Sequence, residues 1–191
     1  MLNTDCAIKG ADAALLKNTL KQTATGLEAV IVARDDMAWS TVRIHTSLAR
    51  FDISVNLQDL PINDEGDVEE FGVLEVSQAC DDEMRLEDVD KDPEWWAIGK
   101  RVDTIVLVNS HVVVRENASV IMDRMYTQAI VIGLEDKSYL ILDKGAWFSE
   151  MITISIDNDW KRHIYDDSQD WEDDPEEPNV HYEWHRSFER I

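Results

Sequence analysis

The chain has 191 residues and a formal net charge of −22, from 40 acidic and 18 basic residues. This length suits a single domain, and a hydrophobic content of 44% with seven tryptophans is enough for a substantial core. The acidic excess repels nucleic acid and anionic membranes, which excludes both as direct partners. There is no apolar run of about eighteen residues and no secretory signal pattern. We therefore expect a cytoplasmic protein.

The first predicted element is a short amphipathic helix over residues 11–22. Ala14, Leu15, Leu16 and Leu20 lie near one face of this helix, and the lysines lie off it. The pattern predicts one apolar side that packs on the rest of the domain.

The next segments have the composition of β-strands. Residues 27–33 form a continuous apolar run that is typical of a buried strand. Residues 42–46 and 51–57 alternate apolar and polar side chains, which predicts a hairpin turning at residues 47–49. Residues 71–76 resume the β pattern after a break.

The strand pattern is strongest after residue 102, where an antiparallel meander is predicted. Residues 135–138 form its clearest turn. In its last strand Ile152, Ile154 and Ile156 share a face, on which we expect a helix to pack. The predicted strands cover residues 104–108, 112–114, 129–134, 139–142 and 152–156. The predicted class is α+β, mostly antiparallel β, with the N-terminal helix packed on the β meander.

The negative charge is concentrated in two blocks. Residues 59–94 contain 15 acidic and 2 basic residues, and residues 164–191 contain 10 and 2. We predict a single domain over residues 1–164, with residues 59–94 as an acidic insertion that includes an exposed loop or short solvated helix at 81–93. Eight acids between residues 166 and 177 predict an acidic, partly flexible C-terminal segment over residues 165–191.

Common catalytic and cofactor motifs are missing from the sequence. No G-x-G pair and no G-x-S-x-G elbow occur. Asp88, Asp90 and Asp92 resemble the start of a calcium loop, but Pro93 stands where that loop requires glycine. We assign no catalytic residue, no metal and no cofactor, and we expect a protein that is not an enzyme.

One constellation near the C-terminus has metal-binding residue types. His181, Glu183 and His185 alternate, so on a strand all three leave the same face and could hold a divalent ion. The interleaved Tyr182 and Trp184 favour another interpretation, in which the segment docks by its aromatic side and leaves its polar side in water. Metal binding by these residues is left open.

Tryptophan directly follows the first acidic block and lies within the second. An exposed aromatic ring among carboxylates is suited to Lys or Arg, because the ring attracts the cation and the acids steer it. Trp95 and Trp96 close the first block, and Trp171 lies within the second. The predicted partner-binding residues are Asp81, Asp82, Glu83, Asp88, Asp90, Asp92, Trp95, Trp96, Asp170, Trp171, Glu172, Asp173 and Asp174.

The stretch from Val102 to Asp157 carries a family resemblance. Its β runs, its turn at 135–138 and the W-F-S-E sequence at 147–150 resemble small acidic immunity proteins of bacterial polymorphic-toxin and contact-dependent inhibition systems. The resemblance implies a stoichiometric inhibitor, often of a nuclease toxin, that covers a basic active site. It implies no catalytic residues.

The sequence therefore predicts an acidic binding protein that neutralises a basic protein partner, namely an immunity protein that inhibits a cognate bacterial toxin, such as a nuclease, by stoichiometric binding. One alternative is a nucleic-acid mimic that inhibits a phage-defence or restriction enzyme. A second is a metal-dependent enzyme with an unrecognised site, and a third is an acidic scaffold whose charge serves solubility.

Overall fold

The computed structural model describes residues 2–32, 37–61, 67–79 and 91–191. Of these residues, 64% are in strands and 11% in helices, and the strands form one mixed sheet. The α+β prediction is therefore wrong, and the fold is largely β. One α-helix, α1 (Gly10–Asn18), has only nine residues, too few to form a layer of its own.

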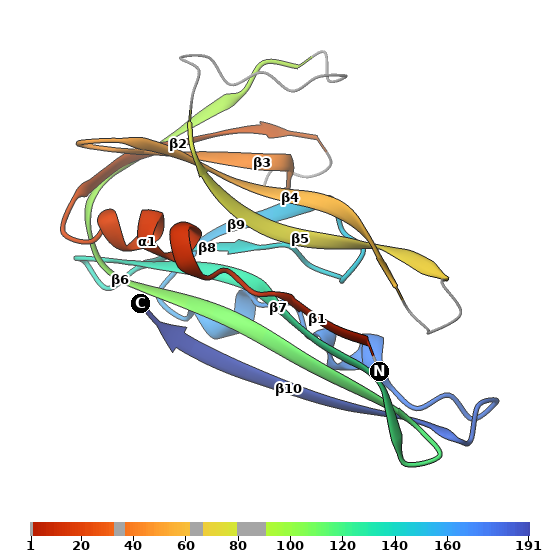
Figure 1. Ribbon diagram of the computed structural model, residues 1–191. Helices are drawn as coiled ribbons and strands as arrows, with labels where there is room; N and C mark the ends of the chain where they lie inside the picture. The colour runs from red at the N-terminus through yellow and green to blue at the C-terminus, as the bar shows by residue number, and fades with distance from the viewer. Residues whose placement is uncertain (1, 33–36, 62–66, 80–90) are drawn as a thin grey trace.

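Ten strands and two 3-10 helices make up the rest of the described structure (Figure 1). The strands are β1 (Leu2–Cys6), β2 (Thr23–Ile31), β3 (Met37–Thr46), β4 (Arg50–Pro61), β5 (Val68–Gln78), β6 (Glu94–Glu116), β7 (Ser119–Leu134), β8 (Tyr139–Asp143), β9 (Met151–Asp157) and β10 (Val180–Arg190). The 3-10 helices are η1 (Trp160–His163) and η2 (Asp167–Trp171).

Six of the strands close into a ring. In the order β2, β3, β9, β8, β7 and β6, each strand pairs antiparallel with the next, and β6 pairs back to β2. Closure leaves no free edge within the ring. Apolar side chains that alternate along these strands form the main core; Ile44, Leu107, Ile130 and Leu142 are all buried in it.

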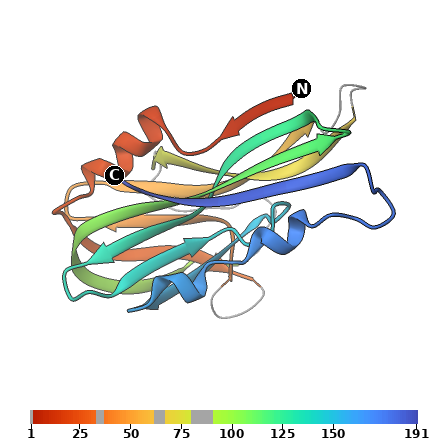
Figure 2. The same ribbon diagram turned by 90° about the horizontal axis from the view of Figure 1, so that it is seen from below.

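The other strands extend the sheet beyond the ring. The distal halves of β6 and β7 form a hairpin, flanked by β1, which runs parallel to β7, and by β10, which runs antiparallel to β6. Figure 2 shows these four strands side by side. β4 pairs with β3 and carries β5 on its outer side. β6 is thus one strand that serves both the ring and the extension.

Two predicted turns are confirmed. β3 and β4 pair as a hairpin, with the turn at residues 47–49 closed by hydrogen bonds between Thr46 and Ala49. β7 and β8 pair around residues 135–138, where Leu134 N donates to Ser138 O at 2.8 Å. β9 continues the meander as expected.

The predicted packing of the helix is wrong. α1 lies against β5 rather than β9, and its Leu16 is buried in the main core. Ile152 and Ile154 instead point into the core of the ring, and the third residue of that face, Ile156, is 46% exposed. The ring strands supply most of that core, so the apolar side of β9 is covered without a helix lying on it.

The acidic regions differ in how far the structure describes them. Residues 81–90 of the predicted exposed loop lie outside the described residues. The C-terminal region forms η1 and η2, a turn-rich segment at 172–179, and β10, which pairs with β6 over its whole length. A domain boundary at residue 164 stays a prediction. Within the described ranges, no helix is long and apolar enough to cross a membrane.

Candidate partner-binding surface

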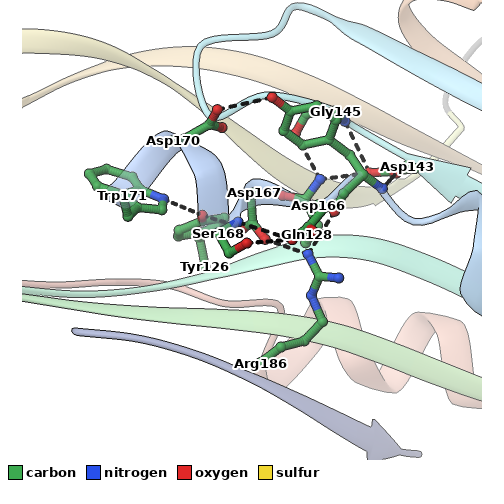
Figure 3. Close-up of polar contacts among 11 residues, drawn as sticks. Tyr126, Gln128, Asp143, Gly145, Asp166, Asp167, Ser168, Asp170, Trp171 and Arg186 are labelled. Atoms are coloured by element: carbon green, nitrogen blue, oxygen red, sulfur yellow. Dashed lines mark hydrogen bonds and ion pairs between the residues drawn. The ribbon is translucent and has the colours of Figure 1, made fainter. Parts of the chain in front are cut away.

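The acidic C-terminal segment is attached to the sheet by a buried carboxylate. Asp167 of η2 is completely buried, accepts a hydrogen bond from Tyr126 Oη at 2.6 Å and forms an ion pair with Arg186 of β10. Trp171 Nε1 donates to the same Tyr126 hydroxyl at 3.2 Å (Figure 3). Burial and the Asp167 carboxylate raise the pKa of Tyr126, which keeps the phenol protonated as a donor.

A second carboxylate ties the preceding chain to β7 and β8. Asp143 accepts from Gln128 Nε2 at 2.7 Å, from Gly145 N at 3.0 Å and from Tyr165 N. Burial raises the pKa of Asp143, against the effect of these hydrogen bonds. Figure 3 shows the contacts of both Asp143 and Asp167. Two acids of this region therefore hold the fold together.

Buried cations lie next to these carboxylates. Lys144 is 1% exposed, and its Nζ lies 4.6 Å from the centre of the Phe71 ring and 4.7 Å from that of Tyr126. Burial lowers the pKa of Lys144 to about 8. Trp147 stacks on Phe71, with their ring centres 5.9 Å apart. The region therefore contains charges that solvent barely reaches.

The predicted acids of the second block fall into two groups. Asp170 is partly buried and accepts from Tyr165 Oη at 2.9 Å, and burial raises its pKa. Glu172, Asp173 and Asp174 are exposed. Trp171 is mostly covered, since it packs between Trp147 and Tyr182. Only the three exposed acids are placed to meet a partner directly.

The exposed acids of this block are joined by acids from two other hairpins. One shallow hollow of about 300 Å³ is lined by Glu116, Glu176 and Glu177, and a neighbouring pocket of about 230 Å³ is lined by Glu69 and Glu177. We call this surface the acidic end; it lies at the right of Figure 1. It consists of Glu69, Glu116, Glu172, Asp173, Asp174, Glu176 and Glu177.

Basic groups do little to neutralise the acidic end. Among the described residues, Arg115 pairs with Glu183 at 2.7 Å, and Arg124 is buried. His181 Nδ1 lies 3.0 Å from Asp173, whose other oxygen accepts from Tyr182 N. These two contacts lower the pKa of Asp173 and fix its side chain against β10. The surface is anionic and partly preorganised.

The residues predicted around the first acidic block do not form one surface. Trp95 and Trp96 open β6, so their side chains leave opposite faces: Trp95 is 52% exposed, and Trp96 packs against the main core. Trp95 contacts the His45 ring at 4.8 Å, and Asp92 is exposed nearby in sequence. The other predicted residues of this block, Asp81, Asp82, Glu83, Asp88 and Asp90, lie outside the described residues.

The two blocks lie at opposite ends of β6. Glu94 pairs with Ala29 at the start of the strand, and Glu116 pairs with Val180 at its end. The 23 residues of β6 correspond to a strand about 70 Å long when measured along the chain. Figure 1 shows that this strand is strongly bent. Trp95 and Trp171 therefore belong to separate surfaces.

The aromatic docking of the C-terminal strand is confirmed. Tyr182 and Trp184 of β10 pack inward, while His181, Glu183 and His185 are exposed on the other face. His181 and Glu183 contact different partners, as described above. Across the described ranges, no three His, Cys, Asp or Glu side chains converge on a possible metal position.

Searches of protein-family models, curated proteins and solved structures found no match to this chain.

Several residues of this region could not be found from sequence patterns. Arg124 and Lys144 look like ordinary surface residues in the sequence, but the structure buries both beside Phe71. Glu69 joins the acidic end only because β5 brings it near a segment more than one hundred residues away. For Arg124 and Lys144 the sequence offers only one signal, a single basic residue near a β-rich segment. This pattern is too common to identify a site.

Proposed function

We propose that this protein binds and neutralises a basic protein partner through the acidic end, as an immunity protein does with its cognate toxin. The main support for this proposal is that carboxylates from β5, from the β6–β7 hairpin and from residues 172–177 converge at one end of the molecule. The resemblance of the stretch from Val102 to Asp157 to immunity proteins supports the same proposal.

The physical basis is electrostatic attraction followed by direct contact. A protein that grips phosphate groups presents Lys and Arg, and carboxylates at similar density can occupy that surface. Fixed carboxylates such as Asp173 lose little freedom on binding, and long-range attraction accelerates association at low salt. Inhibition in this scheme is stoichiometric, requires no catalysis and takes place in the cytoplasm.

The test begins with the partner. The protein is immobilised, native-host lysate is applied at low salt, and retained proteins are eluted with rising salt and identified by mass spectrometry. A single basic protein is expected to remain bound above physiological salt. Its toxic activity, assayed first as nuclease cleavage of plasmid DNA, is expected to fall to zero at one equivalent of inhibitor.

A matched pair of variants then locates the surface. The acidic-end variant carries Glu172→Gln, Asp174→Asn and Glu176→Gln, three exposed acids of that end. The control carries the same types of change at three exposed acids elsewhere, Glu135→Gln, Asp159→Asn and Glu189→Gln. Because both variants lose three charges, any difference between them reports position.

The acidic-end variant should associate about tenfold more slowly at low salt and show a flatter salt dependence. The control should retain most of the wild-type rate. Equal effects of the two variants would mean that net charge alone drives binding. No effect of either would refute the acidic end as the interface and leave the Trp95 surface as the candidate.

A further inference from the structure

A buried guanidinium lines the pocket beside the acidic end. Arg124 of β7 is 1% exposed, and its Nη2 donates to Pro61 O at 3.1 Å. Its Nε has no hydrogen-bond partner. The positive charge lies 4.8 Å from the centre of the Phe71 ring, and no described carboxylate forms an ion pair with it.

This arrangement leaves the Nε donor of Arg124 unused. A guanidinium has five N–H donors, and removing it from water without a counter-ion costs several kcal/mol in real proteins. Burial accordingly lowers the pKa of Arg124. The planar group is best matched by a carboxylate, and the pocket is the space from which a ligand could supply one.

The rest of the pocket restricts which carboxylate fits. Glu69 and Glu177 also line it, so a simple anion meets repulsion. A ligand with a cationic group next to its carboxylate would satisfy both charges. The remaining walls are apolar or aromatic: Val114, Ile121, Met122, Trp171, Val180 and Tyr182.

We propose that this pocket binds a small zwitterion, namely a free α-amino acid with an apolar side chain. The carboxylate interacts with Arg124, the ammonium group with Glu69 and Glu177, and the side chain with the apolar and aromatic walls. The volume of about 230 Å³ lies below the range of about 300–1,000 Å³ typical of sites for drug-sized ligands, which agrees with a ligand of amino-acid size.

Isothermal titration calorimetry on the full chain tests this with four probes. L-leucine and L-phenylalanine carry both charges; N-acetyl-L-phenylalanine lacks the cation, and 2-phenylethylamine lacks the carboxylate. The two free amino acids are expected to bind. 2-Phenylethylamine should bind at least about tenfold more weakly than L-phenylalanine, because it leaves Arg124 without an anion. N-acetyl-L-phenylalanine should bind about threefold to fivefold more weakly, as befits a partly exposed ion pair.

Two neighbouring glutamates on β5 supply a matched pair of variants. Both are exposed, but Glu69 lines the pocket and Glu70 does not. Glu69→Gln should weaken the binding of L-phenylalanine by about threefold to fivefold. It should leave the binding of N-acetyl-L-phenylalanine unchanged or make it slightly stronger. Glu70→Gln should change neither. Arg124→Met should abolish binding, with circular dichroism confirming that the variant is folded.

The proposal is overturned if neither amino acid binds at concentrations up to about 10 mM, which corresponds to less than about 3 kcal/mol of binding free energy. It is also overturned if either single-charge analogue binds as well as L-phenylalanine, or if the two glutamate variants weaken binding equally. Because these titrations contain no partner protein, their outcome is independent of the proposed inhibitory function.

Discussion

Replacing Lys144 with methionine should stabilise the protein at neutral pH. The fold removes this ammonium group from water and places it over the Phe71 and Tyr126 rings, with a hydrogen bond of 3.4 Å to Trp147 O. Methionine has a similar length, carries no charge, and its thioether packs well against aromatic rings. Lys144→Met therefore removes the cost of burying the charge that remains after the attraction of Asp143 and Asp167, and it retains most of the packing.

The size of the effect follows from the pKa. Burial lowers the pKa of Lys144 from 10.5 to about 8, and at about 1.4 kcal/mol per unit this corresponds to about 3 kcal/mol. Below pH 8 the Lys144 side chain is protonated in both the native and the unfolded state, so the native state bears the full cost of burying the charge. Between pH 8 and 10.5 the native state has released a proton that the unfolded state keeps, so wild-type stability rises with pH.

The assay is urea unfolding followed by tryptophan fluorescence at about pH 7 and about pH 9.5. Lys144→Met should be more stable than wild type by up to about 3 kcal/mol at the lower pH, and this advantage should shrink by about 2 kcal/mol at the higher pH. Lys17→Met, at an exposed position on α1, is the control and should change stability little at either pH. An advantage that is independent of pH, or a variant less stable than wild type at pH 7, would refute the reasoning.

Three further predictions concern stability and reactivity. Asp167→Asn removes the anion that meets Tyr126 and β10, so it should destabilise the protein by about 3 kcal/mol in urea unfolding; a loss below about 1 kcal/mol would contradict its role as the attachment point. Gly72→Ala places a Cβ 2.4 Å from Ser149 O, so thermal unfolding should show a loss of about 1–3 kcal/mol, whereas an unchanged midpoint would mean that the chain around 149 yields freely. Burial raises the pKa of Cys6, so in a Cys80→Ser variant its thiol should react with Ellman's reagent at pH 8 more slowly than free cysteine; an equal rate would count against a shielded thiolate.

Sequence patterns predicted the local hairpins well. The turns at 47–49 and 135–138 lie between segments of clear alternation, and side-chain alternation is a local property of the chain. The aromatic face of β10 was predictable for the same reason, because Tyr182 and Trp184 are two residues apart. The side-chain pattern that determines each of these elements lies within a short stretch of the sequence.

Long-range arrangement could not be predicted in this way. Residues 104–108 and 112–114 were expected as separate strands, but polar Asn109, Ser110 and His111 continue β6 because β7 and β10 pair with it on both sides. The parallel pairing of β1 with β7 joins residues more than one hundred positions apart. Ring closure likewise depends on pairings between distant strands, which leave no local signal.

The position of β10 has a consequence for aggregation. From Val106 to Glu116, β10 covers the backbone edge of β6 opposite β7, in a stretch rich in valine. A valine-rich strand with free N–H and C=O groups is a template for pairing with other chains. Shortening the protein at its C-terminus would expose that template, so chains cut before residue 180 should self-associate even though they remain strongly acidic. β10 thus replaces a valine-rich edge with an edge that carries charged side chains, which disfavours the addition of neighbouring copies to the sheet.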